Sequence, residues 1–168
     1  ADKLLEREAV KYAAGLLMPK YLFEPVLTER RDLSLVRHEE VATIFSTSVL
    51  ATAMRLADLD IQPVLIACYS PSGLRWHKRA GQIRARWFLR KQLDSDSFAH
   101  DFFQDGQPHP RLGIQSAETW FENFDAENFQ VHECCRPIRR DELLVVLVLD
   151  STMLYARCDS DARGRKWI

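Results

Sequence analysis

The run LLVVLVL at residues 143–149 is the most continuously hydrophobic segment of the chain and decides its fold class. It is far shorter than the roughly 18 apolar residues of a membrane span and has the length of a strand, so it predicts the strongest strand of the chain. A polar turn at residues 139–142 precedes it, and residues 129–135 alternate as a strand does. Upstream, residues 64–69 and 74–78 flank the turn sequence SPSG and predict a hairpin. Together these segments predict a sheet.

Helical patterns occupy the first third of the chain, so the sequence as a whole predicts an α+β protein. We expect a helical region over residues 1–60 and a small mixed α/β domain over residues 61–168. Residues 20–37 are expected to form a connector with only a short helical turn, because Pro25 interrupts them. Residues 106–110 contain two prolines and are expected to be a loop.

Length and composition narrow the classes of protein that fit. With 168 residues and 46% hydrophobic content, the chain can bury a core. A formal net charge of −1 excludes a protein that is basic throughout, so any nucleic-acid contact would need a local patch. No apolar run reaches membrane length, and we expect no membrane partner. The four cysteines have no regular spacing, which favours a reducing cytoplasm over a disulfide framework.

Residues 3–19, KLLEREAVKYAAGLLMP, predict a helix that a proline ends. Apolar or small residues recur at every third or fourth position, so we expect one broad buried face. That face comprises Leu4, Leu5, Ala9, Tyr12, Ala13, Leu16 and Leu17. Glu8 lies on it, where a carboxylate is costly unless it is paired or binds a metal. Spacing alone favours a pair with Lys11 or Lys3.

The order E-R-E-A-x-x-Y-A-A-x-L-L-M-P in this segment closely resembles the third-ligand helix of the ImmA/IrrE family of zinc metallopeptidases. In that family an upstream HExxH helix supplies two histidine ligands and a general-base glutamate, so the resemblance implies that Glu8 is the third zinc ligand. Val10 stands where the family usually has asparagine, and no HExxH occurs in this chain. We therefore expect the chain to be the C-terminal part of such a protein, cut just before the third-ligand helix and not catalytic by itself.

The resemblance also implies a function for the full-length protein. It would be a cytoplasmic bacterial enzyme, with zinc as cofactor, that cleaves a repressor-like partner in response to a signal and so regulates transcription, as in a stress response. The fragment alone is expected to bind no zinc. Members of the family carry a helix-turn-helix and then a C-terminal domain that in some is similar to GAF sensor domains. Residues 61–168 are accordingly expected to form a GAF- or PAS-like sensor domain.

The segment EEVATIFSTSVLATAMRL at residues 39–56 looks like a helix-turn-helix, with Ser48 as the N-cap of the second helix. A recognition helix should present Arg, Lys, Asn or Gln to base edges. This one offers a single cation, Arg55, against Asp58 and Asp60, a balance that a phosphate backbone repels. The pattern favours a helical packing unit over DNA binding through Arg55.

Residues 73–93 carry seven cations and no carboxylate, with aromatic side chains between them. Cations beside aromatic rings can hold a small or anionic ligand through charge and stacking, and pockets in sensor domains lie against the sheet. The acids that follow at residues 94–105 support an alternative, a set of surface ion pairs around one helix. The candidate ligand-binding residues are Arg75, Trp76, Arg84, Arg86 and Trp87.

Two rival functions remain open. A non-enzymatic regulator would join the helix-turn-helix segment to a ligand-sensing domain without proteolysis. A pure interaction module would use Trp120, Phe121, Phe124 and Phe129 as a partner surface, although aromatic residues at this spacing are more often core. The sequence HECC at residues 132–135 invites a metal interpretation, but adjacent strand residues point to opposite faces and rarely reach one tetrahedral ion.

Overall fold

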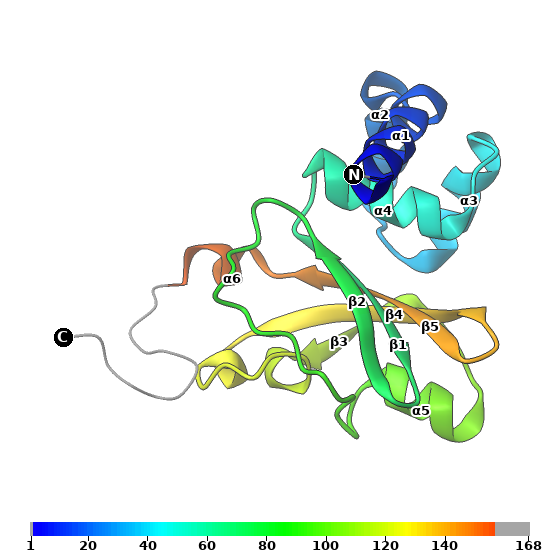
Figure 1. Ribbon diagram of the computed structural model, residues 1–168. Helices are drawn as coiled ribbons and strands as arrows, with labels where there is room; N and C mark the ends of the chain where they lie inside the picture. The colour runs from blue at the N-terminus through cyan, green and yellow to red at the C-terminus, as the bar shows by residue number, and fades with distance from the viewer. Residues whose placement is uncertain (1, 157–168) are drawn as a thin grey trace.

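Six α-helices and a five-stranded antiparallel sheet make up residues 2–156, the part of the chain that the computed structural model describes, without the side chains of residues 2–4 and 7 (Figure 1). The helices are α1 (Asp2–Leu17), α2 (Lys20–Thr28), α3 (Leu35–Ile44), α4 (Val49–Leu59), α5 (Phe98–Asp105) and α6 (Ser151–Tyr155). The strands are β1 (Val64–Ser70), β2 (Gly73–Arg79), β3 (His109–Ser116), β4 (Gln130–Arg139) and β5 (Glu142–Leu149), with 3-10 turns η1 (Ala117–Thr119) and η2 (Ala126–Asn128). The predicted α+β class is confirmed. None of the helices within residues 2–156 is both long and apolar enough to cross a membrane.

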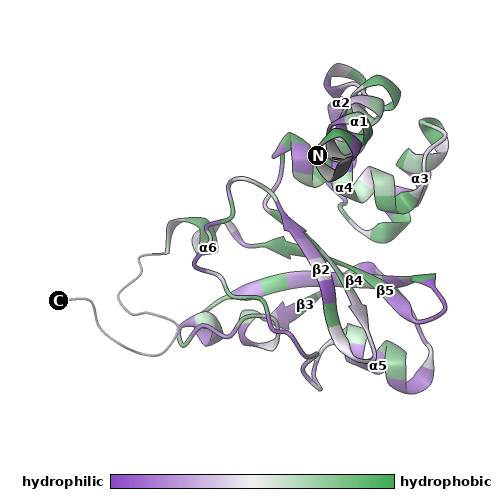
Figure 2. Ribbon diagram, in the orientation of Figure 1, coloured by the Kyte–Doolittle hydropathy of each residue, from purple (hydrophilic) through white to green (hydrophobic). Residues whose placement is uncertain are grey.

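The central strand of the sheet is β5, the predicted hydrophobic run. The strand order is β2-β1-β5-β4-β3, so β5 pairs with β1 on one side and with β4 on the other, and both pairings are antiparallel. Figure 2 shows the hydrophobic colouring of β5 and the polar turn that joins it to β4. The four strands predicted from the sequence are confirmed, at residues 64–69, 74–78, 129–135 and 143–149.

Side chains alternate between the two faces of the sheet, and both faces are covered. Cys134 of β4 pairs with Val146 of β5, which pairs with Ile66 of β1, so these three side chains share the face on which α3 and α4 pack. The neighbouring Glu133 points to the opposite face, where it meets the N-terminus of α5. Because both faces are buried, β1 and β5 are continuous apolar runs rather than alternating ones.

Two ion pairs fasten the helical layer to the sheet. Asp58 of α4 pairs with Lys78 of β2, and Glu39 of α3 lies 3.4 Å from Arg136 of β4. In Figure 1, α3 and α4 lie between the sheet and the outer pair α1 and α2. Core residues of the helices and of the sheet belong to one continuous hydrophobic cluster.

The predicted break between two helices is confirmed at α3 and α4. The Ser34 hydroxyl accepts a hydrogen bond from the backbone N–H of Arg37 at 3.3 Å, and Ser48 accepts one from Ala51 at 3.1 Å. Both serines are N-caps, and each satisfies a donor that the first helical turn leaves unpaired. The short turn at residues 45–48 then brings α4 back against α3.

The prediction of a connector at residues 20–37 is wrong, because the segment contains the nine-residue helix α2 with Pro25 inside it. A proline in a helix removes one hydrogen bond, a local cost that tertiary packing can offset. Phe23 and Leu27, one turn apart on α2, are both fully buried in the core. Burial of these two side chains holds the helix together despite the proline.

The prediction of a loop at residues 106–110 is wrong at its C-terminal end, because β3 begins at His109 and runs to Ser116. As an edge strand, β3 tolerates Pro110, whose missing N–H would disrupt a central ladder. Its register with β4 shifts between His109 and Gly113. At Gly113 an added Cβ would lie 2.4 Å from the ring of Phe98, so the strand approaches α5 as closely as glycine permits.

The helix predicted over residues 3–19 is confirmed as α1, but its predicted buried face is exposed at every position whose side chain the structure describes, which leaves out Leu4. Leu5, Tyr12 and Leu16 are 69%, 78% and 79% exposed. Ala9 and Ala13 between them are exposed as well. We call these five residues the apolar stripe of α1. Within the described residues, then, α1 is anchored chiefly at its end, where Met18 is buried.

This exposure gives a direct expectation for stability. Replacing Leu16 with alanine should change the free energy of unfolding by less than about 0.5 kcal/mol, because the side chain leaves no cavity. The same substitution at the fully buried Leu27 should cost about 2–5 kcal/mol. Urea denaturation of both variants provides the comparison. A cost above about 1 kcal/mol for Leu16→Ala would mean that this stripe is covered in the folded chain.

Candidate functional site

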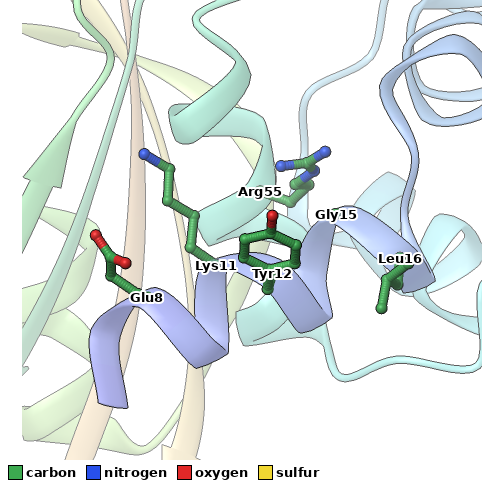
Figure 3. Close-up of a pocket in the computed structure, with 6 residues that line it drawn as sticks. All are labelled: Glu8, Lys11, Tyr12, Gly15, Leu16 and Arg55. Carbon is green, nitrogen blue, oxygen red and sulfur yellow. The ribbon is translucent and has the colours of Figure 1, made fainter. Parts of the chain in front are cut away.

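The predicted metal ligand Glu8 lies at one end of a groove between α1 and α4 (Figure 3). The groove has a volume of about 500 Å³. Its lining residues are Glu8, Lys11, Tyr12, Gly15 and Leu16 of α1 and Arg55 of α4. Figure 3 shows Lys11 and Tyr12 directed to the side of α1 on which Arg55 lies. We call this feature the α1–α4 groove.

The groove carries three charged groups that do not neutralise one another. Among the described residues, Glu8, Lys11 and Arg55 take part in none of the ion pairs, so the pair expected from spacing between Glu8 and Lys11 is not formed. Arg55 is half-buried and donates a hydrogen bond from Nε to the carbonyl of Met18 at 3.0 Å. This bond fixes the guanidinium at the groove while leaving its terminal nitrogens for another acceptor.

A single exposed carboxylate fits zinc as one ligand but does not make a site. Catalytic zinc takes three protein ligands from histidine, cysteine or carboxylate side chains. The side chains that the structure describes within residues 2–156 include no cluster of three such groups that could hold a metal ion. If Glu8 binds zinc, the remaining ligands must therefore come from outside these residues.

The sequence HECC at residues 132–135 alternates across the sheet. Glu133 and Cys135 point to one face, and Cys134 points to the other, toward α3. Burial raises the pKa of the Cys135 thiol to about 12 and raises that of Cys134 further, so both thiols stay protonated at neutral pH. These cysteines behave as small core side chains.

The five candidate ligand-binding residues divide between two places. Arg75 and Trp76 lie on the edge strand β2, where Arg75 is exposed and Trp76 pairs with Cys68. Arg84, Arg86 and Trp87 lie in the irregular segment that follows β2. None of the five lines the α1–α4 groove or the second cavity, which is lined by Thr28, Arg31, Leu33 and Gln62.

Trp87 and Arg86 form a packed cluster rather than an open platform. Trp87 is fully buried, its ring lies 5.5 Å from that of Phe121, and its indole N–H donates to the carbonyl of Met153 at 3.1 Å. The Arg86 guanidinium lies 4.3 Å from the centre of the Trp87 ring and pairs with Asp125 at 2.8 Å. The cation is thereby engaged by an aromatic ring and by a carboxylate of the protein itself.

The second helix of the helix-turn-helix-like segment packs into the molecule. On α4, Thr52, Ala53, Leu56 and Ala57 are buried, and the helix contacts β1 and β2. Arg55, the candidate DNA-binding residue, faces the α1–α4 groove. A recognition helix must protrude far enough to enter a major groove, and α4 does not protrude.

Sequence reasoning missed the role of Glu133, a fully buried carboxylate between β4 and α5. Its Oε1 accepts a hydrogen bond from the backbone N–H of Ala99 at 2.8 Å, and its Oε2 accepts one from Trp120 Nε1 at 3.0 Å. Burial raises the pKa of Glu133 to about 7, although both hydrogen bonds act to lower it. The signal was present in the strand alternation, which places Glu133 on the inward side with Val131 and Cys135.

The four aromatic residues of the interaction-module hypothesis do not form one surface. Trp120 and Phe121 are buried in the core, and Phe129 packs against it. Phe124 alone is widely exposed, at 76%.

No protein-family model matches the sequence, and no curated protein matches it at a significant level.

Proposed function

We propose that this chain is the C-terminal part of a zinc metallopeptidase of the ImmA/IrrE type, which cleaves a repressor-like protein in the bacterial cytoplasm. The observation that carries the proposal is the exposed apolar stripe of α1 with Glu8 on the same side of the helix. A surface helix normally turns such a stripe toward a core. The stripe is therefore suited to pack against a catalytic segment that supplies the other zinc ligands.

Energetics support a covering segment. Burying a leucine or a comparable apolar side chain stabilises a protein by about 1.5–3 kcal/mol. Leu5, Tyr12 and Leu16 are more than two-thirds exposed, so most of this stabilisation is available to a partner segment. A carboxylate within such an interface needs a counter-charge, and a bound metal ion supplies one.

In the assembled site, the role of this chain is to hold the Glu8 carboxylate on a rigid helical turn. When bound, zinc would lower the pKa of a coordinated water and polarise the peptide carbonyl. Lys11 and Tyr12, about one turn along α1, line the same groove as Glu8 and would be available to contact substrate. Val10 replaces an asparagine that is usual in the family, and its side chain offers no hydrogen bond to support a ligand.

The sheet would act as the regulatory domain of this peptidase, with a GAF- or PAS-like fold. The antiparallel strand order β2-β1-β5-β4-β3, in which the first hairpin of the sheet lies beside its last strand, supports this proposed fold. The ion pairs of Asp58 with Lys78 and of Glu39 with Arg136 connect this sheet to the helical layer that carries α1. The same connection is the observation that favours the second candidate, a non-enzymatic regulator in which the helices relay a ligand signal.

Zinc content of the full-length protein tests the proposal. In the native protein, Glu8→Gln should lower bound zinc at least tenfold, since amide oxygen is a much poorer zinc ligand than carboxylate. Glu6→Gln, an exposed carboxylate two residues away on α1, is the matched control and should leave zinc content unchanged. Zinc would be measured by mass spectrometry of the purified protein.

Two results would overturn this proposal. One is unchanged zinc content in Glu8→Gln. The other is a native product of only 19.5 kDa in the cells of origin, because no catalytic segment would then accompany the chain. In the second case the non-enzymatic regulator becomes the working function.

A further inference from the structure

We propose that the α1–α4 groove binds an acidic side chain of an extended protein substrate, close to the bond that is cleaved. This inference rests on the proposed function, because it assigns a specificity subsite to the same helix that carries Glu8. The expected occupant of the groove is a polypeptide segment with a glutamate or aspartate flanked by apolar residues.

The cations of the groove match an acidic side chain. Lys11 and Arg55 approach the groove from two different helices, and among the described residues neither has a carboxylate partner. Arg55 is half-buried and held by its bond to the Met18 carbonyl, so its cation is pre-oriented. A guanidinium with unused terminal donors matches the two oxygens of a carboxylate. Glu8 carries the one opposing charge, so the two cations leave the described lining of the groove with a net positive charge.

The groove also has an apolar wall. Tyr12 and Leu16 line it at the edge of the apolar stripe and are exposed. The groove side of these two side chains can pack against apolar neighbours of the bound acid while the catalytic segment covers the remainder of the stripe. Gly15 lies between them in the sequence, and a Cβ at this position would meet no atom within 4 Å. The groove is therefore open over Gly15, as binding of an extended backbone requires.

Distance along α1 places the subsite relative to the cleaved bond. The helix rises about 1.5 Å per residue, so Lys11 lies about 4.5 Å and Gly15 about 10 Å along the axis from Glu8. An extended peptide advances about 3.3 Å per residue. The acidic residue would thus lie roughly one to three residues from the bond at the zinc.

The charges of the groove disfavour a nucleic acid as the occupant. Among the side chains that the structure describes, two cations face it, and the carboxylate of Glu8 lies in the same groove. A phosphate backbone presents a charge every few ångströms and needs a run of cations along its track. A single acidic side chain needs only the pair that is present.

The test is a titration of the isotopically labelled 168-residue chain with a matched pair of peptides, followed by nuclear magnetic resonance. One peptide has eight residues, a glutamate among leucine and alanine, and the other has glutamine in place of the glutamate. The glutamate peptide should bind at least tenfold more tightly, and its shifts should map to α1 and α4. Lys11→Ala and Arg55→Ala should each remove most of this preference. Arg111→Ala, an exposed cation on the far edge strand, should not.

A steric variant provides a second test that leaves both cations in place. Gly15→Leu should fill the groove and weaken binding of both peptides at least tenfold, while leucine at a helical position does not weaken the helix. Equal affinity for the two peptides, shifts that map elsewhere, or tight salt-sensitive binding of a random DNA duplex at the same residues would each overturn the inference.

A failure of the peptide subsite can be distinguished from a failure of the proposed peptidase function. The titration needs no zinc and no cleavage, so the groove can bind acidic peptides even if Glu8→Gln leaves zinc content unchanged. Conversely, loss of zinc in Glu8→Gln together with equal peptide affinities would retain the peptidase and remove only the subsite.

Discussion

Replacing Glu133 with alanine is expected to destabilise the protein by about 3–5 kcal/mol. The substitution leaves the buried donors of Ala99 and Trp120 without an acceptor and opens a cavity between β4 and α5. Urea denaturation monitored by tryptophan fluorescence would measure the loss. Glu127→Ala, which removes an exposed carboxylate, is the control and should stay within about 0.5 kcal/mol. Equal costs for the two variants would contradict the role of Glu133 in joining α5 to the sheet.

The same carboxylate gives the protein a defined pH dependence. Its pKa of about 7 in the folded state exceeds the reference value of 4.5, so the folded state binds the proton more tightly than the unfolded chain. The corresponding stability is present in full below about pH 4.5, is lost as the pH rises to about 7, and then stays constant. Compared with Glu133→Gln, which does not titrate, the native protein should lose about 3 kcal/mol over this window. Parallel pH profiles for the two proteins would contradict the assignment.

Trp87→Ala is expected to cost about 3–5 kcal/mol, the second large effect. The indole is fully buried among aromatic rings, including Phe121 and Phe129, and donates to the Met153 carbonyl. Its loss leaves a large cavity and an unpaired carbonyl near α6. Phe124→Ala, which removes an exposed aromatic side chain, is the comparison. Thermal or urea unfolding should show a change in its free energy of unfolding below about 0.5 kcal/mol.

Trp87→Phe separates packing from hydrogen bonding at this position. Phenylalanine keeps an aromatic ring but cannot donate to Met153, so we expect a smaller loss than for alanine, about 1–3 kcal/mol. If Trp87→Ala were nearly neutral in stability but abolished binding of an anionic metabolite, Trp87 would line a ligand pocket as first expected from the sequence, and its core role would be wrong.

Segments with a strong local pattern were predicted well from the sequence. The hairpin β1–β2, the strands β4 and β5, and the break between α3 and α4 each carry a period, a turn sequence or a capping residue that acts over a few positions. By contrast, α2 and β3 contain prolines that argue locally against regular structure. In α2, burial of Phe23 and Leu27 overrides the proline, and in β3 the edge position makes it harmless. Neither condition is visible before the tertiary fold is known.

The candidate sites show the same boundary between local and tertiary information. Glu8 and Lys11 share a groove because they lie one helical turn apart, which spacing alone implies. Arg55 joins them from another helix, and the sequence offered it only as a DNA contact. The stretch of cations and aromatic rings at residues 73–93 divides instead between a strand edge and a buried cluster, since the chain turns inward between Arg79 and Trp87.

The placement of β5 at the centre of the sheet has a consequence for biosynthesis. It is the last of the five strands of the sheet to leave the ribosome, yet it lies between β1 and β4 and supplies the second partner of each. Pairing of Val64 with Val148 closes a loop of more than eighty residues, a contact of high sequence separation that slows folding. During translation, α1–α4 can therefore form before the sheet against which they pack exists. Nascent chains that stall before residue 142 would expose the unpaired edges of β1 and β4 to aggregation and to chaperones.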